Sequence, residues 1–202
     1  MSVAEVETPR TPMPNAPLMR FSADRYEELT RLGVFGTGDK VELINGYLVE
    51  KMPQNDAHSF IVDLLSEIFL RALPPEWTIR CQFPVRMSFD TLPEPDAVIV
   101  PGPKTKYRRR KPRPKDIAIA IEVSDSSLRY DRTTKYAIYA RDLVPVYWIV
   151  NIPDEVIEVY ALPKAGRSPS YSKKVVYAPG SQVPVMLNAK RVGEVNVDSF
   201  FA

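Results

Sequence analysis

Two carboxylates, Asp96 and Glu122, stand where short apolar stretches predict neighbouring strands. Asp96 directly precedes the apolar stretch 97–100, and Glu122 lies near the end of the stretch 117–123. Neighbouring strands lie about 4.8 Å apart, so two such side chains on one face of a sheet can share an ion. Hard cations such as Mg²⁺ are usually held by one or two carboxylates. The spacing therefore permits a divalent metal site formed by Asp96 and Glu122.

Both carboxylates also have a purely structural interpretation. Asp96 follows Pro95, and Pro-Asp is a common turn pair at the entrance of a strand. Glu122 could form an ordinary ion pair with Arg132 or Lys135 on the segment that follows it. Lys135, taken alone, would be an exposed residue of a helix. The residue types and their spacing leave these alternatives open.

Side-chain alternation places Glu122 on the face of its predicted strand that carries the smaller side chains. Ile117, Ile119 and Ile121 share one face, whereas the other face carries Ala118, Ala120, Glu122 and Ser124. The second face combines small side chains with a terminal carboxylate. Either a helix could approach it closely, or a cleft could open over it.

An Asn45-Gly46 pair predicts a β-hairpin between the stretches 41–44 and 47–50. These two residue types tolerate the positive φ angles of a type I′ turn. A two-residue loop pairs Glu42 with Val49, which places this carboxylate on a face with three apolar side chains. A charged group in that position needs an explanation.

Three helices are predicted from apolar periodicity. The first spans residues 22–32 with Ser22 as its N-cap, and the second, the longest, spans 56–73. The third spans 131–143 with Asp131 as its N-cap, and Lys135 lies beside its buried stripe. His58, the only histidine, lies at the start of the second helix. It could line a cleft as a phosphate donor or proton carrier, or it could be a solvated or capping residue.

The remaining pattern predicts a mixed α/β domain with a central sheet flanked by helices. Strict alternation from Ile79 to Phe89 indicates one long strand with a bend at Pro84, and the stretches 97–100, 117–123 and 146–150 fit strands buried on both faces. Further β-rich segments follow at 156–160, near Val175 and Val183, and at 195–201. We expect one domain over residues 18–202.

Residues 1–17 contain four prolines and are expected to form a disordered tail without a signal-peptide core. No stretch reaches the roughly 20 apolar residues that span a bilayer. Cys81 is the only cysteine, which excludes an intrachain disulfide. These features predict a cytoplasmic protein that does not enter a membrane.

One segment concentrates basic charge. Eight Lys or Arg residues and no acid occur between positions 104 and 115, although the net charge of the chain is only +2, so the rest of the chain is net acidic. They are Lys104, Lys106, Arg108, Arg109, Arg110, Lys111, Arg113 and Lys115. Such a run can neutralise nucleic-acid phosphates, and Tyr107 within it could stack on a base. The high charge, together with Pro103 just before the segment and Pro112 and Pro114 within it, also fits a solvated flexible loop. Because the segment joins the strands of Asp96 and Glu122, we expect it to form a positive flap beside them.

Several motifs, in this order, resemble the PD-(D/E)XK nuclease superfamily, and specifically its Uma-type family of "putative restriction endonucleases". The resemblance covers most of the chain. It rests on residues 42–46 (Glu-Leu-Ile-Asn-Gly), 95–100 (Pro-Asp-Ala-Val-Ile-Val), 121–124 (Ile-Glu-Val-Ser), 131–135 (Asp-Arg-Thr-Thr-Lys), Tyr139-Ala140, and 144–150 (Val-Pro-Val-Tyr-Trp-Ile-Val).

The resemblance implies a restriction-endonuclease-like fold with a four-stranded mixed core sheet. It further implies that Asp96 and Glu122 ligate Mg²⁺ or Mn²⁺ while a lysine activates water. Ser124 stands where the superfamily motif has its lysine, and Lys135, thirteen residues past Glu122, matches the position that this family uses instead. Glu42 would be a further acidic member. DNA, double-stranded by default, is the implied substrate, and cutting both strands makes a dimer plausible.

Two other functions fit the same residues. The replacement of the motif lysine by Ser124 favours a catalytically inactive nuclease-fold module that binds DNA or assists assembly. The aromatic residues Tyr147, Trp148 and Tyr160 favour a structural domain for protein interaction. Salt-dependent DNA binding would argue against the second alternative, and metal-dependent cleavage would argue against the first.

Overall fold

The computed structural model describes residues 15–36 and 38–201. Most of the predicted tail at 1–17 lies outside these residues. Within the described part of the chain, no helix has both the length and the apolar character needed to cross a membrane.

A mixed six-stranded sheet forms the centre of the domain. Its order is β3 (Trp77–Cys81), β4 (Ala97–Pro101), β5 (Ile119–Ser124), β6 (Val146–Asn151), β7 (Val156–Lys164) and β8 (Ser170–Tyr177). Of its five strand pairs, β5 and β6 are parallel and the others are antiparallel. The predicted central mixed sheet is thus confirmed, and it is two strands wider than the four-stranded core that the resemblance implied.

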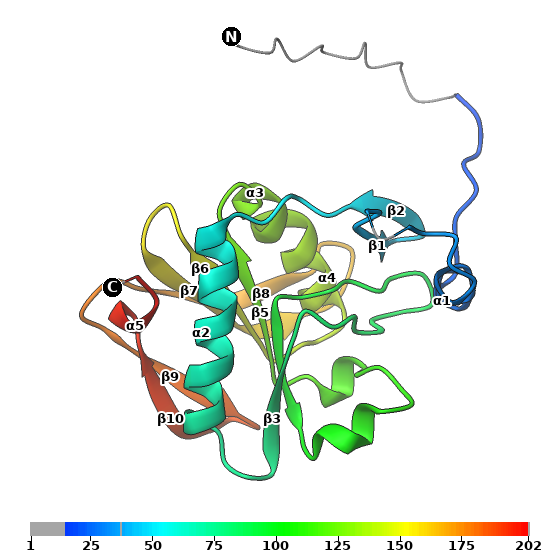
Figure 1. Ribbon diagram of the computed structural model, residues 1–202. Coiled ribbons are helices and arrows are strands. Elements are labelled where there is room, and N and C mark those ends of the chain that lie inside the picture. The colour runs from blue at the N-terminus through cyan, green and yellow to red at the C-terminus, as the bar shows by residue number, and fades with distance from the viewer. Residues whose placement is uncertain (1–14, 37, 202) are drawn as a thin grey trace, which may run out of the picture.

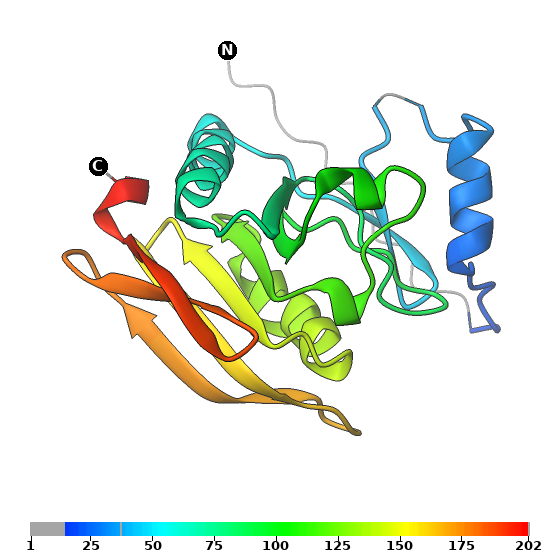
Figure 2. The ribbon, with the colours of Figure 1, turned by 90° about the horizontal axis from the view of Figure 1, so that it is seen from below.

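Helices cover both faces of this sheet (Figures 1 and 2). On one face lie α2 (Asp56–Ala72), the small sheet of β9 (Gln182–Leu187) and β10 (Lys190–Asn196), and the short helix α5 (Asp198–Phe201). On the other lie α3 (Leu128–Tyr130), a π-helical turn (Asp131–Lys135) and α4 (Tyr136–Arg141). The central strands are therefore buried on both sides, which explains their unbroken apolar runs.

The β1–β2 hairpin and α1 lie beside the main sheet (Figure 2). β1 (Val41–Ile44) and β2 (Tyr47–Glu50) pair with Glu42 opposite Val49, as predicted. Asn45 and Gly46 have φ angles of 50° and 82°, which are the positive values of the expected turn. A Cβ on Gly46 would lie 2.7 Å from Cβ of Arg20, so only glycine fits there.

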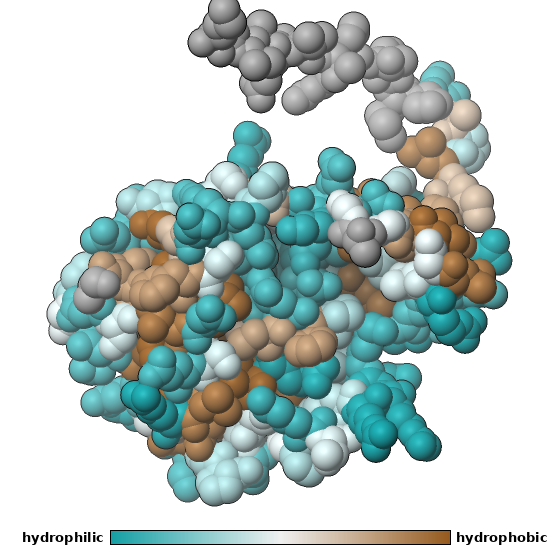
Figure 3. All heavy atoms as spheres, in the orientation of Figure 1, coloured by the Kyte–Doolittle hydropathy of each residue, from teal (hydrophilic) through white to brown (hydrophobic). Residues whose placement is uncertain are grey.

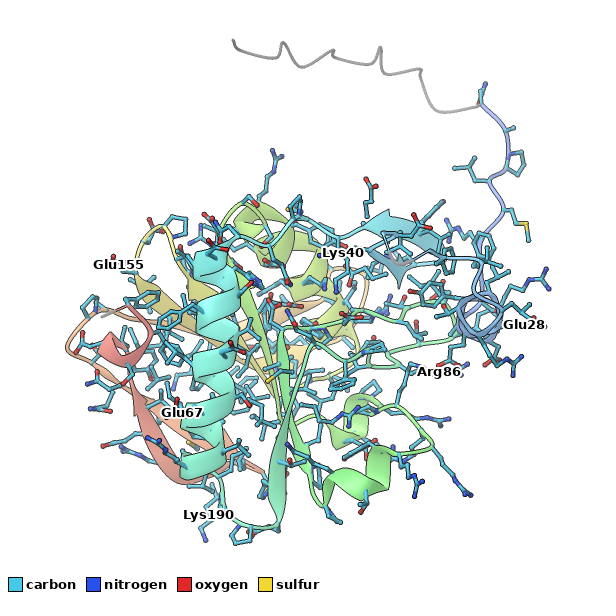
Figure 4. The ribbon with its side chains drawn as sticks, in the orientation of Figure 1. Glu28, Lys40, Glu67, Arg86, Glu155 and Lys190 are labelled. Atoms are coloured by element: carbon cyan, nitrogen blue, oxygen red, sulfur yellow. The ribbon has the colours of Figure 1, made fainter. Side chains whose placement is uncertain are left out.

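The predicted first two helices are confirmed. α1 (Ala23–Arg31) has Ser22 as its N-cap, and the Ser22 side chain accepts a hydrogen bond from Arg25 N. α2 begins after Asn55, whose side chain caps it by accepting from His58 N. Figure 4 shows Arg86 reaching toward α1, where it pairs with Asp24 and Glu27.

The strand predicted to run from Ile79 to Phe89 is wrong in its second half. β3 ends at Cys81, and the next residue, Gln82, has a φ of 53°, which turns the chain out of the sheet. After this turn only Val85 and Met87 of the predicted alternation are buried, and they pack on the α4 side of the sheet, whereas Phe83 and Phe89 are exposed. The alternation in the sequence therefore does not correspond to strand pairing in this segment.

The predicted alternation along β5 holds from Ile119 onward but fails before it. Ile117 lies outside the strand and packs on the α4 side, and Ala118 packs on the α2 side. A short 3₁₀ turn at Pro114–Asp116 ends just before Ile117 and resets the register.

The helix predicted over 131–143 begins earlier than expected. Helical turns start at Leu128, and Asp131 is buried inside the π turn rather than capping a helix end. Its carboxylate accepts hydrogen bonds from Ser124 Oγ at 2.7 Å and Ser127 Oγ at 2.6 Å. These partners satisfy Asp131 inside the helix, so the capping prediction was wrong. The expected β-rich end at 195–201 also differs, because β10 stops at Asn196 and α5 follows.

Candidate active site

Asp96 and Glu122 lie side by side on the α4 face of the sheet. Ala97 pairs with Ile121 in the antiparallel register of β4 and β5, which sets Asp96 opposite Glu122. The backbone N–H of Asp96 donates to Glu122 Oε2 at 3.2 Å, and the N–H of Val123 donates to Asp96 Oδ2 at 2.8 Å. Strand register alone thus brings together two carboxylates that are 26 residues apart in the sequence.

Lys135 joins these carboxylates to Glu42. Its Nζ lies 2.9 Å from Glu42 Oε2 and 3.2 Å from Glu122 Oε1. The residue is only 5% exposed, so the interpretation of Lys135 as an exposed helix residue is wrong. Glu42 is equally buried, and its pairing with Lys135 explains the carboxylate on the inner face of the hairpin.

The π turn holds Lys135 in this position. Ser124 is fully buried and donates to Asp131, four residues before Lys135, while Ser127 donates to the same carboxylate. Ser124 therefore anchors the segment that carries the lysine. π turns occur often at functional sites because they change the direction of side chains within a helix.

Two tyrosines that were not predicted as site residues complete the hydrogen-bonding around the carboxylates. Tyr139 donates to Glu122 Oε1 at 2.7 Å, and Tyr130 donates to Glu42 Oε1 at 3.2 Å. Tyr139 follows Lys135 by four residues, the spacing that places two side chains on one helix face. That spacing was a usable signal for placing Tyr139 beside Lys135.

His58 extends from α2 to Asp96. Its Nε2 lies 3.2 Å from Asp96 Oδ2, whereas its Nδ1 is buried without a partner among the described residues. The residue is 8% exposed and Asn55 caps the helix, so neither the solvated nor the capping interpretation holds. His58 lines the cleft, as the alternative prediction stated.

These side chains border a cavity of about 140 Å³. Its wall includes Glu42, His58, Asp96, Glu122, Tyr130 and Lys135. The surface is hollowed between α2 and the β1–β2 hairpin (Figure 3). A small ligand can thus reach buried carboxylates from the solvent.

Negative charge exceeds positive charge around this cavity. The pKa of Glu122 is raised to about 8: burial raises it most, Lys135 acts in the opposite direction, and Asp96 and Asp131 add to the rise. Burial would lower the pKa of Lys135, but Glu122 and Glu42 outweigh it and raise the pKa well above its ordinary value. Lys135 therefore remains a cation, and a second cation would stabilise the ionised form of Glu122.

The donor set fits a hard divalent cation. Within 15–36 and 38–201, no three His, Cys, Asp or Glu residues are grouped as a metal-binding cluster. Mg²⁺ does not need such a cluster, because it keeps several waters and is typically bound through one or two carboxylates. Asp96 Oδ1 receives no hydrogen bond from the described residues, whereas Oδ2 accepts two, so one oxygen remains for a ligand.

The basic segment lies at the opposite end of the strands from the carboxylates, so its predicted place as a flap beside them is wrong. Asp96 precedes β4 and Glu122 is near the end of β5, whereas residues 102–118 connect the end of β4 to the start of β5. A connection between antiparallel strands joins the ends far from this pair. The distance along β4 is about 17 Å for five residues.

The segment is also folded rather than loose. Tyr107 ends a 3₁₀ turn (Lys104–Tyr107), is 5% exposed and donates to Pro101 O, so the expectation that it stacks on a base is wrong. Arg110 forms two hydrogen bonds with Asp116, and Lys111 pairs with Glu27. The side chains of Lys104, Arg108, Arg109, Arg113 and Lys115 are exposed. Hydrophilic side chains gather over this region in Figure 3.

A solved structure has the same fold. It is described as a "putative nuclease belonging to DUF820" from Anabaena variabilis ATCC 29413. The match has a TM-score of 0.64 with 15% sequence identity, and it covers 90% of this chain and 97% of the other. No match was found among curated proteins.

The restriction-endonuclease-like class expected from the sequence is thereby supported at the level of the fold. The sequence matches the family model Uma2, "Putative restriction endonuclease", over residues 23–189. The chain belongs to the Uma2 family.

Proposed function

We propose that this protein is a metal-dependent endonuclease that hydrolyses phosphodiester bonds of DNA. The observation that carries the proposal is the convergence of Asp96, Glu122 and Lys135 on one cavity. Asp96 directly precedes β4, Glu122 lies on β5 and Lys135 on the π turn, and all three line the same cavity. Membership in the Uma2 family, whose description is "Putative restriction endonuclease", supports the same reaction class.

Asp96 and Glu122 would hold Mg²⁺ or Mn²⁺ at the scissile phosphate. The bound cation would neutralise phosphate charge and lower the pKa of a water molecule. Lys135 is a cation at neutral pH, so it would orient the attacking water and stabilise negative charge rather than accept a proton. Glu42 would position Lys135 by holding its Nζ at 2.9 Å.

The exposed cations of the basic segment would bind the DNA backbone at a distance from the reacting bond. Double-stranded DNA is the proposed substrate, and two copies of the chain would allow both strands to be cut. Arg108 and Arg109 form no ion pair among the described residues and are the best candidates for phosphate contacts. Each contact would release counterions, so binding would weaken as salt rises.

Plasmid cleavage with Mg²⁺ or Mn²⁺, against a chelator, tests the proposal. We expect Asp96→Ala, Glu122→Gln and Lys135→Ala to lower the cleavage rate by about 10²-fold or more. Glu155→Gln, an exposed acid at the edge of the domain (Figure 4), is the control and should cleave normally. Cleavage that is unchanged in Glu122→Gln would refute the mechanism. Salt-dependent DNA binding without any cleavage would support the inactive binding module instead.

A further inference from the structure

Arg80 is a cation without a counter-ion in the described part of the chain. It lies on β3, and its guanidinium is 5.2 Å from the ring of Tyr107 and 4.7 Å from the ring of Phe83. No ion pair or hydrogen bond of the described residues engages its side chain, and its Nε is buried without a partner. Its two Nη atoms also have no hydrogen-bond partner among the described residues, yet unlike Nε they are not buried. They therefore reach the solvent.

The other cations around Tyr107 behave differently. Arg110 and Lys106 also approach the ring, at 5.0 and 5.6 Å, but both pair with Asp116. Arg80 contacts the same ring and has no carboxylate. A planar guanidinium that lies within about 5 Å of two rings, with free Nη groups, is well placed to bind a phosphate.

Phe83 offers an exposed aromatic surface next to this guanidinium. The turn at Gln82 carries it out of the sheet, and the residue remains 53% exposed. Unpaired bases stack on such rings whatever their sequence.

Arg80 lies between the proposed active site and the basic segment. It pairs with Val98 in the register of β3 and β4, so its side chain shares a sheet face with Asp96, two residues before Val98. The Cα atoms of Arg80 and Asp96 are therefore about 8 Å apart, because they are separated by one strand spacing across the sheet and two residues along the strand. Through Tyr107, Arg80 also contacts the basic segment. A nucleic-acid strand that leaves the carboxylates in this direction meets Arg80 and Phe83 first.

We propose that Arg80 and Phe83 form a binding site for an unpaired nucleotide, with its phosphate on Arg80 and its base on Phe83. The substrate would then be DNA with a single-stranded stretch next to the cleaved bond. This inference rests on the proposed function, because it names the structural class of the substrate for that site.

Fluorescence anisotropy in a chelator tests the site without cleavage. The probes are a labelled duplex and the same duplex with a single-stranded extension. We expect the wild type to bind the extended probe more tightly. Phe83→Leu keeps an apolar side chain but removes the stacking ring, so it should weaken binding of the extended probe by about 5-fold or more and leave the blunt duplex unchanged. Phe83→Trp should restore the preference.

Arg80→Gln tests the phosphate contact. For a single strand it should reduce the slope of log affinity against log salt by about 0.7, the value for one phosphate, while Arg80→Lys keeps the slope. Circular dichroism checks that each variant is folded. The matched controls are Phe60→Leu, a phenylalanine on α2 that is 55% exposed, and Arg167→Gln in the connection between β7 and β8.

Equal binding of both probes by the wild type, or a Phe83→Leu variant that behaves like Phe60→Leu, would overturn this inference. Duplex binding and metal-dependent cleavage would survive that result, so the proposed function would stand. Failure to bind either probe would overturn both.

Discussion

Two buried acidic clusters lie on the same face of the sheet and take their cations from the same π turn. Glu158 on β7 is 1% exposed and pairs with Arg132 of the π turn and with Lys174 of β8. Glu122 on β5 is nearly as buried, but it shares the single cation Lys135 with Glu42. One cluster has two cations for one buried carboxylate, with the exposed Asp154 also near Arg132, and the other has one cation for several buried carboxylates.

The pKa values show the consequence of this difference. Burial alone would raise the pKa of Glu158, but hydrogen bonds from Arg132, Lys174 and Tyr160 lower it to about 2. Burial raises the pKa of Glu122 to about 8, because Lys135 is not enough to offset burial and the neighbouring acids. Glu158 and Glu122 are both nearly excluded from solvent, at 1% and 4% exposure, but Glu158 has two partly exposed cations beside it and Glu122 shares one buried cation. The second cluster is therefore the one that an added cation would stabilise more.

Removing Lys135 should have the largest effect on stability. Lys135→Met leaves Glu42 and Glu122 buried without their cation, so we expect the free energy of unfolding to fall by about 3–5 kcal/mol in a chelator. Saturating Mn²⁺ should raise the free energy of unfolding of Lys135→Met more than that of the wild type, because the ion replaces the missing positive charge. Urea denaturation with and without Mn²⁺ measures both effects.

Arg132→Met is the matched control for this prediction. Arg132 is partly exposed, so its loss should cost only about 1 kcal/mol. Mn²⁺ should stabilise this variant no more than the wild type. The same Mn²⁺-dependent gain in Arg132→Met and Lys135→Met would mean that the two clusters do not differ in their need for a cation.

Glu158 should contribute to stability in a defined pH range. Its pKa is lowered from 4.5 to about 2 in the folded state, so its contribution is complete above pH 4.5 and is lost as the pH falls toward 2. The contribution is at most about 3 kcal/mol, since each pKa unit corresponds to about 1.4 kcal/mol. Acid titration of the unfolding free energy, wild type against Glu158→Gln, measures it. A constant difference between the two proteins from pH 5 to pH 2 would contradict the assignment.

The smallest effect is expected from single tyrosine hydroxyls. Tyr139→Phe removes the 2.7 Å hydrogen bond to Glu122, so Mn²⁺ affinity should fall by about 10-fold, the lower end for loss of a group that orients a metal ligand. Tyr160→Phe removes the corresponding hydrogen bond to Glu158 and should leave Mn²⁺ affinity within about 2-fold. Calorimetric titration with Mn²⁺ compares them. Equal losses would show that the tyrosines affect the fold rather than the metal site.

Local patterns predicted several elements of the fold well. Asn45-Gly46 indicated the hairpin and its register, because the turn type depends on two residues only. Apolar periodicity indicated α1 and α2, and unbroken apolar runs indicated β4, β5 and β6. The end of β3 could not be predicted, since a positive φ at Gln82 has no marker in a non-glycine residue. The π turn also had no local signal, because its partners Ser124 and Ser127 lie outside it.

The amino-acid sequence by itself determined the candidate carboxylates, the lysine that matches the family pattern and the strands that carry Asp96 and Glu122. Tertiary structure decided which of these groups contact one another. It placed Lys135 between Glu42 and Glu122, added Tyr130 and Tyr139, brought His58 to Asp96, and moved the basic segment to the far end of the strands. The physical reason is that strand register and helix packing bring residues that are distant in the sequence within hydrogen-bond range. Burial then shifts the pKa values of these groups, and no short stretch of sequence determines that shift.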